Sequence, residues 1–349
     1  MKKEIVWLDY ARLIGILLVV LGHSLQSIPE WNESAIIKGL WDYIYLFHMP
    51  VFFLISGFLY KQNRGEGLRV GGGKIFYALI LPYLIYQFAY TPFFLIGHRD
   101  EIANPIIWMK MIMGIIDGDG YNTPFSMYVC LPCWFIVSII QLRILFLFVP
   151  INKISALLLT MFALVFLVMR KQLNIDFYFC VDSTIMAIPY FLAGYFLRKK
   201  MDLLQSINNI RLLLGALLFG VIVYVDLVMN GAAQMNGPSY GNSILANYMA
   251  GFSGSMMLFL ISIPMAKILH ENSFVKTISR NTLFIIFFHW VMLLFVGRIL
   301  HFQFLHGIGT IGYILCSFAL SVFILTISYF VITLWVDKYT LVFGKKKYE

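Results

Sequence analysis

An arginine and a histidine share one face of the first hydrophobic stretch of the chain. Arg12 and His23 are eleven residues apart in a segment dominated by apolar residues. At about 100° and 1.5 Å per residue, this spacing completes three helical turns to within about 20° and spans about 16 Å. Ionisable side chains are costly in hydrocarbon, so we predict that both face protein or water at a functional site.

Three further polar side chains extend this set. Asp9 lies three residues before Arg12 and can pair with it on one helix, as an orienting group or only as a structural ion pair. His48 is followed by Pro50, which would bend its helix and free a carbonyl, so His48 either borders a cavity or caps that carbonyl. His289 is either a third polar group of the same cavity or a histidine bonded to a neighbouring helix.

A glycine-rich basic segment, 61–74, is the fourth candidate. It contains Arg69, three consecutive glycines and Lys74. Glycines let backbone amides approach a phosphate, and basic side chains supply charge, so Arg69 and Lys74 could bind an anionic cofactor. The spacing fits no Walker motif, and a flexible cytoplasmic loop with the expected positive charge is the alternative.

Composition sets the class of protein that must position these residues. Hydrophobic residues make up 60% of the 349, charged residues only 12%, and mean hydropathy is +0.83. These values exclude an ordinary soluble domain. Runs of sufficient length and hydropathy predict an all-α integral membrane protein with about ten transmembrane helices, near 6–27, 40–60, 75–97, 130–149, 153–169, 183–198, 211–229, 243–266, 281–297 and 310–336.

The distribution of basic residues predicts the orientation. With these spans, 18 of the 26 Lys and Arg residues fall on the side that holds both termini, six on the opposite side, and Arg12 and Arg143 within spans. Cytoplasmic loops carry the excess of Lys and Arg, so both termini are predicted to be cytoplasmic. The net charge of +9 is therefore a topology signal, and we expect no nucleic-acid partner.

The organisation predicts one polytopic transmembrane domain over 1–349 with no fused soluble domain. Fixed-period repeats are absent from the sequence. The longest connections, expected to be polar, are near 98–123 and 230–242 on the outer side and 61–74 on the inner side. Whatever the protein does is expected to happen within or beside the bilayer.

Four segments together resemble a known family. Asp9-x-x-Arg12 followed by His23, and then Phe47-His-Met-Pro-Val-Phe-Phe-Leu-Ile-Ser-Gly-Phe58, resemble the acyltransferase family 3 membrane O-acyltransferases. Pro189-Tyr-Phe-Leu-Ala-Gly-Tyr-Phe-Leu-Arg198 and Asn281-Thr-Leu with His289 resemble later segments of its stand-alone, fucose-4-O-acetylase-like members. The resemblance thus covers nearly the whole chain.

The resemblance implies an enzyme of the bacterial cytoplasmic (inner) membrane. Such an enzyme moves an acyl group, usually acetyl, from cytoplasmic acetyl-CoA to a hydroxyl of a cell-envelope or exported carbohydrate, of which a lipid-linked glycan is one form. The arginine and histidine of the family's first span fall on Arg12 and His23. The basic cluster common before the third span is thinned here to Arg69 and Lys74. No metal is expected, and the partners are acyl-CoA, the carbohydrate acceptor and the lipid bilayer.

We therefore take one set of residues as candidate catalytic groups: His23, Arg12, Asp9, His48 and His289. A second set is expected to bind the acyl donor: Arg12, Arg69 and Lys74. His23 would act as a general base towards the acceptor hydroxyl or as a nucleophile that carries the acyl group. The competing hypotheses are a polytopic transporter or channel that uses intramembrane His and Arg, and a non-catalytic scaffold of an envelope-polymer assembly.

Overall fold

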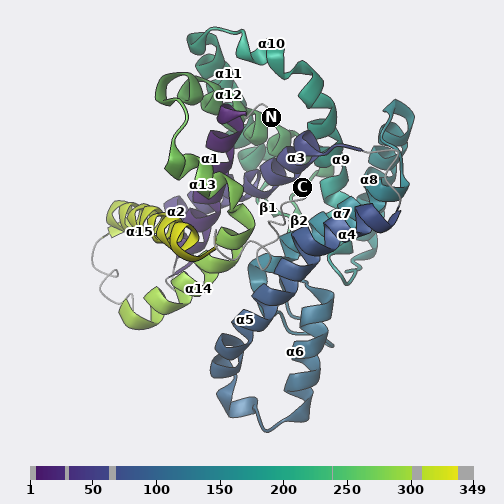
Figure 1. The fold of residues 1–349 in the computed structure, drawn as a ribbon, viewed down its shortest axis with the longest axis vertical. Coiled ribbons are helices and arrows are strands. Elements are labelled where there is room, and N and C mark those ends of the chain that lie inside the picture. The colour runs from purple at the N-terminus through teal and green to yellow at the C-terminus, as the bar shows by residue number, and fades with distance from the viewer. Residues whose placement is uncertain (1–4, 28–30, 63–67, 238, 301–308, 337–349) are drawn as a thin grey trace. The chain divides into compact units, whose positions relative to one another are not determined.

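The computed structural model describes residues 5–27, 31–62, 68–237, 239–300 and 309–336. Within these ranges the chain is almost entirely helical (Figure 1). The helices are α1 (Val6–Leu25), α2 (Ala35–Tyr45), α3 (His48–Leu59), α4 (Leu68–Ile75), α5 (Leu81–Gly97), α6 (Pro105–Asp117), α7 (Trp134–Phe148), α8 (Lys153–Leu173), α9 (Val181–Leu197), α10 (Met201–Gln205), α11 (Asn209–Asn230), α12 (Ile244–Leu269), α13 (Ser273–Arg280), α14 (Thr282–Leu300) and α15 (Gly309–Val331). Two short strands, β1 (Ala233–Gln234) and β2 (Ser239–Tyr240), pair with each other.

The chain divides into two units. Unit 1 comprises Met1–Leu59, Ala193–Gln234 and Tyr240–Trp335. Unit 2 comprises Tyr60–Leu192, Met235–Ser239 and Val336–Glu349. Unit 1 therefore contains α1 to α3 and α10 to α15, and unit 2 contains α4 to α8.

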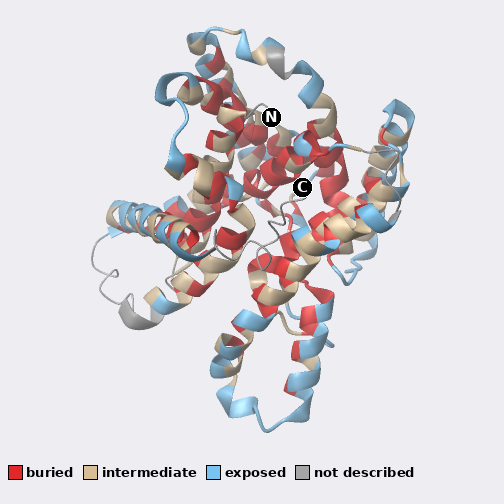
Figure 2. Cartoon of the chain, viewed as in Figure 1, coloured by how far each residue is buried: buried red, intermediate tan, exposed pale blue. Residues whose placement is uncertain are grey.

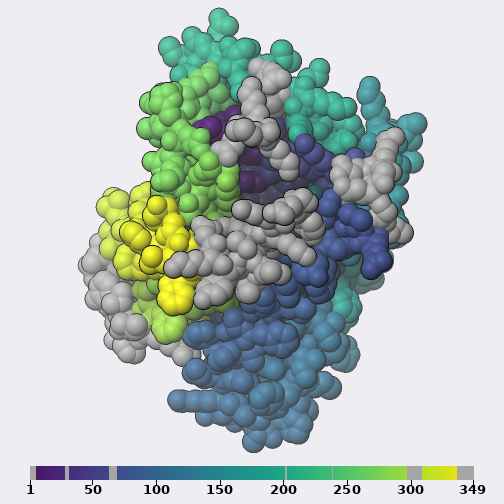
Figure 3. Space-filling model, viewed as in Figure 1, coloured from purple at the N-terminus to yellow at the C-terminus, as the bar shows by residue number. Residues whose placement is uncertain are grey.

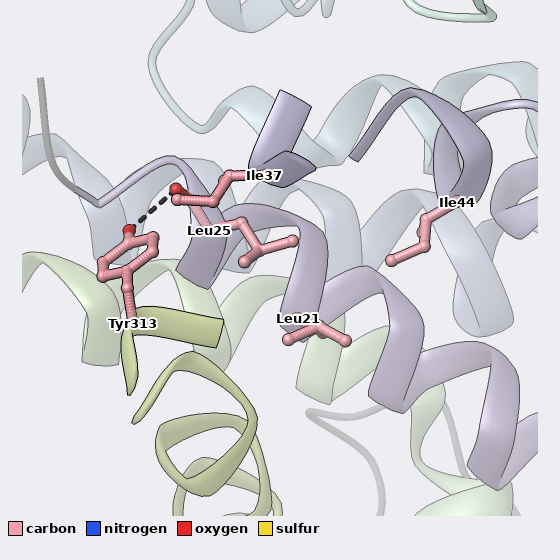
Figure 4. Packing of buried hydrophobic residues seen from close by; sticks show 5 residues of the cluster. All are labelled: Leu21, Leu25, Ile37, Ile44 and Tyr313. Atoms are coloured by element: carbon pink, nitrogen blue, oxygen red, sulfur yellow. Dashed lines mark hydrogen bonds between the residues drawn. The ribbon is translucent and has the colours of Figure 1, made fainter. Parts of the chain in front are cut away.

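Helix α1 is the central element of unit 1. It packs against α3, α12, α13, α14 and α15, and Figure 1 shows it surrounded by later parts of the chain. Near its end, Leu21 and Leu25 pack with Ile37 and Ile44 of α2, and Tyr313 of α15 donates a hydrogen bond of 2.7 Å to the Leu25 carbonyl (Figure 4). Helix α3 is buried along nearly its whole length (Figure 2). Helices α1 and α3 thus form much of the interior of unit 1, and α2 covers the end of α1 with one face.

Local sequence signals set several helix ends. Asn152 and Ser155 form a capping box at the start of α8, which ends at Asn174 in the left-handed conformation. Helix α6 begins with Pro105 after an Asn104 cap. It ends at Gly118, which adopts a φ of 71° without steric cost because glycine has no Cβ. These ends follow from the local sequence alone.

The predicted membrane-protein fold is confirmed. Eight helical stretches of the described residues are long and apolar enough to cross a bilayer, and α13 with α14 makes a ninth if this pair, bent by 86°, is one span. The predicted span near 183–198 corresponds to α9, which has only 17 residues. The count of ten spans and the cytoplasmic termini stay predictions.

The least buried helices carry apolar side chains outward. Helices α8, α11 and α15 expose large hydrophobic residues along their length, and α15 contributes to the surface seen in Figure 3 (yellow). In water such surfaces would aggregate, whereas in a bilayer lipid tails cover them. This distribution is that of an integral membrane protein.

Two connections differ from the expected polar loops. The connection near 98–123 contains α6, which exposes Ile106, Met109, Ile112 and other apolar side chains. In the segment 61–74, the three glycines lie inside α4, and residues 63–67 are outside the described ranges. An added Cβ at Gly71 would lie 2.4 Å from Leu147 Cδ1, so this glycine allows α4 to approach α7. Gly71 therefore serves helix packing, whereas no described atom lies within 4 Å of an added Cβ at Gly72 or Gly73.

Candidate active site

The three histidines selected from the sequence lie together in unit 1. His23 projects from α1, His48 from the start of α3 and His289 from α14. The ring centroids of His23 and His289 are 5.3 Å apart. Tyr45 connects His23 with His48, because its ring centroid lies 6.2 Å from that of His23 and 4.3 Å from that of His48. We call His23, His48 and His289 the histidine cluster.

Two of these imidazoles are oriented by the backbone. His48 Nδ1 is 3.1 Å from the Ile44 carbonyl oxygen, and His289 Nδ1 is 2.8 Å from the Ile285 carbonyl oxygen. A carbonyl only accepts, so Nδ1 donates in both rings and, in the neutral ring, Nε2 keeps its lone pair. His289 is fully buried, and its Nε2 has no partner in the described part of the chain. A proton donor on a substrate could satisfy this nitrogen.

The third imidazole is oriented by side chains. The Tyr45 hydroxyl donates to Gln26 Oε1 at 3.3 Å and lies 3.5 Å from His23 Nδ1. Because its one proton goes to Gln26, the hydroxyl oxygen can accept from His23 Nδ1, which leaves Nε2 of His23 as an acceptor. Both distances lie at the long end of the hydrogen-bond range. Trp290 meets the His23 ring edge-on, 5.2 Å away.

Arg12 is held at the other end of the same unbroken helix. Its Nη1 is 4.0 Å from Asp9 Oδ1, and Asp9 also accepts a hydrogen bond from the Ser279 hydroxyl at the end of α13. Arg280 is close enough to Arg12 for their charges to interact. Asp9 therefore ties α1 to α13 and keeps two guanidinium groups near one another.

The bend between α13 and α14 explains why one face of α1 meets both helices. The two helices meet at Asn281 with an angle of 86°. The Asn281 side chain donates to the Thr277 carbonyl at 2.8 Å and closes the end of α13. Helix α13 then contacts Asp9, and α14 brings His289 to His23. Helix α13 thus lies beside Asp9 on α1, and α14 lies beside His23 on the same helix.

The interruption expected near Pro50 lies slightly earlier in the chain. Helix α2 ends at Tyr45 and α3 begins at His48, so Pro50 is in the first turn of α3, where its missing N–H is not needed. His48 Nδ1 bonds the Ile44 carbonyl, which is not the carbonyl of Leu46 that Pro50 leaves without its helical partner. The same ring contacts Tyr45 in the cluster, and the role of His48 stays a prediction.

Comparison with known protein families decides the class of the protein. A model of the family described as an acyltransferase domain matches residues 5–332. The chain belongs to acyltransferase family 3. Comparisons with curated proteins and with solved structures found no match. The protein is therefore a membrane acyltransferase, and the role of each residue in it must be argued from its own structure.

The histidine cluster offers a family 3 acyltransferase suitable chemistry. Transfer of an acyl group to a hydroxyl needs a group that removes the hydroxyl proton or a nucleophile that carries the acyl group. An imidazole with Nδ1 bonded and Nε2 free can serve in either role. The described residues contain no group of three His, Cys, Asp or Glu side chains placed to hold a metal ion.

The two predicted donor ligands outside α1 belong to unit 2. Arg69 is exposed on α4, and Lys74 lines a cavity of about 410 Å³. Arg12, the third predicted ligand, belongs to unit 1. Arg69 does not line this cavity, whereas Lys61 and Arg143 do.

Sequence reasoning missed several neighbours of the histidine cluster. Tyr45, Gln26 and Trp290 all lie beside His23. Tyr45 is three residues before His48 and Trp290 directly follows His289, so proximity in sequence to a chosen histidine was the available signal. Arg280 had a weaker signal, since it only precedes the resembling segment that starts at Asn281.

A second buried polar group, in unit 2, uses carboxylates. Asp117 accepts hydrogen bonds from the Phe179 N–H at 2.5 Å and from the Ser126 hydroxyl at 2.8 Å. Asp119 accepts from the Cys180 N–H at 2.6 Å. Phe179 and Cys180 have φ values of 63° and 54°, a region that non-glycine residues rarely adopt. The two carboxylates, here called the aspartate pair, therefore fasten a left-handed turn.

Burial also changes the acidity of Asp119, which is only 4% exposed. Burial and the neighbouring Asp117 carboxyl together raise the pKa of Asp119 to about 7, against the opposing effect of the Cys180 N–H.

Proposed function

We propose that this acyltransferase moves an acetyl group from acetyl-CoA to a hydroxyl of a cell-envelope or exported carbohydrate, such as a lipid-linked glycan. The observation that carries the proposal is the convergence of His23, His48 and His289 from three helices, with the Nε2 of His289 buried and unpartnered within the described residues. Three imidazoles at one point of a membrane protein are costly to bury, and ionisable side chains in such a position generally mark a functional site.

In the first form of the mechanism, His23 is a general base. Its Nε2 takes the proton of the acceptor hydroxyl while the hydroxyl oxygen attacks the thioester carbonyl carbon. The carbon–sulfur bond then breaks, and the imidazolium returns the proton to the leaving sulfur. The products are the acetyl ester and the free thiol of coenzyme A.

In the second form, His23 is a nucleophile. Its Nε2 attacks the thioester carbon, the carbon–sulfur bond breaks, coenzyme A leaves as the thiolate, and the acetyl group stays on the imidazole, which is then positively charged. The acceptor hydroxyl then attacks that acetyl group while His289 Nε2, one ring away, takes the hydroxyl proton and later gives it up to the thiolate through solvent. The bond between the acetyl group and His23 breaks, and His23 is again neutral. Acetyl label that stays on the protein without acceptor distinguishes this form from the first.

Basic side chains would hold the phosphates of the donor. Arg12, Arg69 and Lys74 are the proposed ligands, and the excess of Lys and Arg predicts that the donor comes from the cytoplasm. The proposed location is the bacterial cytoplasmic membrane. Arg12 and His23 are separated by about 16 Å along α1. This separation suits a donor that carries phosphates at one end and a thioester at the other.

Aromatic rings beside the histidine cluster would suit a sugar. Trp41 stacks on Tyr45 at a centroid distance of 3.6 Å, and Trp31 lies 5.0 Å from Trp41. Sugar rings pack their apolar faces on such side chains. This supports a carbohydrate acceptor.

The test measures coenzyme A release from acetyl-CoA by the purified protein in liposomes, with a lipid-linked glycan extract as acceptor. The His23→Ala variant should lose at least about a hundredfold in rate. His98→Ala is the matched control, because His98 Nδ1 also bonds a carbonyl four residues earlier, at 2.9 Å, but lies outside the cluster. It should keep the wild-type rate.

Full release by a folded His23→Ala protein would contradict the assignment of His23. Release by the wild type from a longer acyl-CoA but not from acetyl-CoA would contradict the acetyl donor alone. Release that is independent of the glycan extract and leaves no acetyl ester on any glycan would contradict the carbohydrate acceptor.

A further inference from the structure

A basic cavity in unit 2 is lined by two cations, Lys61 and Arg143, that the transfer chemistry described above does not use. Its volume is about 410 Å³, within the range of ligand sites in proteins. It lies where α3 has ended, α4 begins and α7 ends, and its lining consists of Tyr60, Lys61, Gln62, Gly71, Lys74, Ile75, Arg143, Phe146, Leu147, Phe148 and Pro150. Three of these side chains are cationic, and no acidic residue of the described ranges is among them. We call it the Arg143 cavity.

Arg143 is the unusual member of this lining. It belongs to α7, a helix apolar enough to cross a bilayer, where a charge normally has a partner or a function. Its guanidinium carbon lies 4.7 Å from the centroid of the Tyr60 ring and 6.0 Å from that of Phe191. No carboxylate among the described residues pairs with it. Among the described residues, its charge is stabilised by the faces of these two aromatic rings.

The neutral polar groups of the cavity wall are already occupied. The Tyr60 hydroxyl donates to the Phe146 carbonyl at 2.9 Å. The Gln62 amide donates to the carbonyls of Phe146 and Val149, and its oxygen accepts from the Ile151 N–H at 2.8 Å. These bonds fix the wall and leave the cationic groups as the means of recognising a ligand.

We propose that the Arg143 cavity binds a phosphate ester group, with the phosphate on Arg143 and Lys61 and the attached organic part along the apolar rim. A planar guanidinium forms paired hydrogen bonds with phosphate oxygens, and a flexible lysine adds a second charge. Leu147 and Phe148 supply the apolar rim, and Phe148 is 64% exposed. Two sources carry this chemistry: the headgroup of an anionic phospholipid and the phosphorylated nucleotide end of coenzyme A.

The test compares binding of two probes to the full chain in detergent. Adenosine 3′,5′-bisphosphate represents the nucleotide source, and short-chain phosphatidylglycerol represents the lipid source. At least one should bind the wild type, and Arg143→Gln should weaken that binding by about tenfold or more. Lys153→Gln is the matched control, because Lys153 is an exposed cation at the start of α8 outside the cavity. It should bind as the wild type does.

Two further variants keep the test decisive. If Arg143→Gln does not fold, the exposed Lys61→Gln should still weaken binding severalfold. Arg143→Lys keeps the charge but not the planar fork, and should bind between the wild type and Arg143→Gln. The probe that binds identifies the source of the phosphate.

Binding of neither probe to the wild type would overturn the proposal. Equal binding by wild type, Arg143→Gln and Lys61→Gln would overturn it as well. Neither result would affect the proposed acetyl transfer, which is measured separately by coenzyme A release and loss of that release in His23→Ala.

Discussion

The histidine cluster of unit 1 and the aspartate pair of unit 2 are both buried and polar, but they use their atoms differently. Each carboxylate of the aspartate pair accepts an N–H of the 179–180 turn, so these bonds hold a loop in place. Nδ1 of His48 and Nδ1 of His289 each bond the carbonyl four residues earlier. The Nε2 of His289 has no partner among the described residues and is left for another molecule. Polar groups that connect distant segments serve the fold, whereas groups satisfied locally remain available for chemistry.

The largest effect on the rate of coenzyme A release should come from removing Nε2 of His289 while keeping the hydrogen bond to the Ile285 carbonyl. In His289→Asn, the side-chain amide can replace Nδ1 as donor to the Ile285 carbonyl, but the Nε2 lone pair is lost. We expect the rate of coenzyme A release to fall about a hundredfold with little change in thermal stability. The same change at His98 should alter neither quantity. A His289→Asn enzyme with the wild-type rate would show that this nitrogen has no role in the reaction.

A smaller effect should follow from moving a neighbour of the cluster. An added Cβ at Gly22 would lie 2.8 Å from Cε2 of Tyr45, so Gly22→Ala must displace that ring. Tyr45 then loses its position against His23 and His48. We expect the transfer rate to fall about tenfold, as when a catalytic group is misplaced without being removed. Gly39→Ala is the control, since no atom lies near its added Cβ.

The smallest expected effect is the contribution of Asp119, in the aspartate pair, to the pH dependence of folding stability. The pKa of Asp119 is raised to about 7 in the folded protein, against about 3.9 in an unfolded chain. The folded state therefore holds an extra proton between these values. The stability that this group contributes is complete below about pH 4, declines as pH rises to about 7 and stays constant above it.

Thermal unfolding at pH 5 and pH 8 measures this effect. The wild type should unfold at a higher temperature at pH 5, and the difference between the two pH values should shrink in Asp119→Asn, which carries no titrating proton. Coenzyme A release per folded molecule should not follow Asp119, because the aspartate pair holds a loop. An unchanged pH difference in the variant would refute the assignment to Asp119.

The sequence was most informative about contacts within one helix. The spacing of Arg12 and His23 predicts their shared face, because helical geometry is fixed by residue number alone. Asp9 beside Arg12 follows from the same rule. The hydrophobic runs likewise predicted an all-helical membrane protein.

Contacts between distant segments were beyond such reasoning. His48 and His289 could be selected because histidine is rare in apolar helices, but their meeting with His23 depends on how the helices pack. The helical α6 was obscured by the polar residues around it. Arg143 was recognised as lying within a span, but its position over Tyr60 depends on the approach of two segments more than 80 residues apart.

The tie between Asp9 and Ser279 affects how the protein is made. These residues are 270 positions apart, and helix α1 is completed by contacts with helices that are made much later, in the last third of this sequence. Until that part is synthesised and inserted, Arg12 lacks the α13 contact and His23 has no α14 beside it. A chain in which α13 and α14 are not yet made therefore enters the membrane without an assembled site, and the inner face of α1 stays in contact with lipid until those helices are in place.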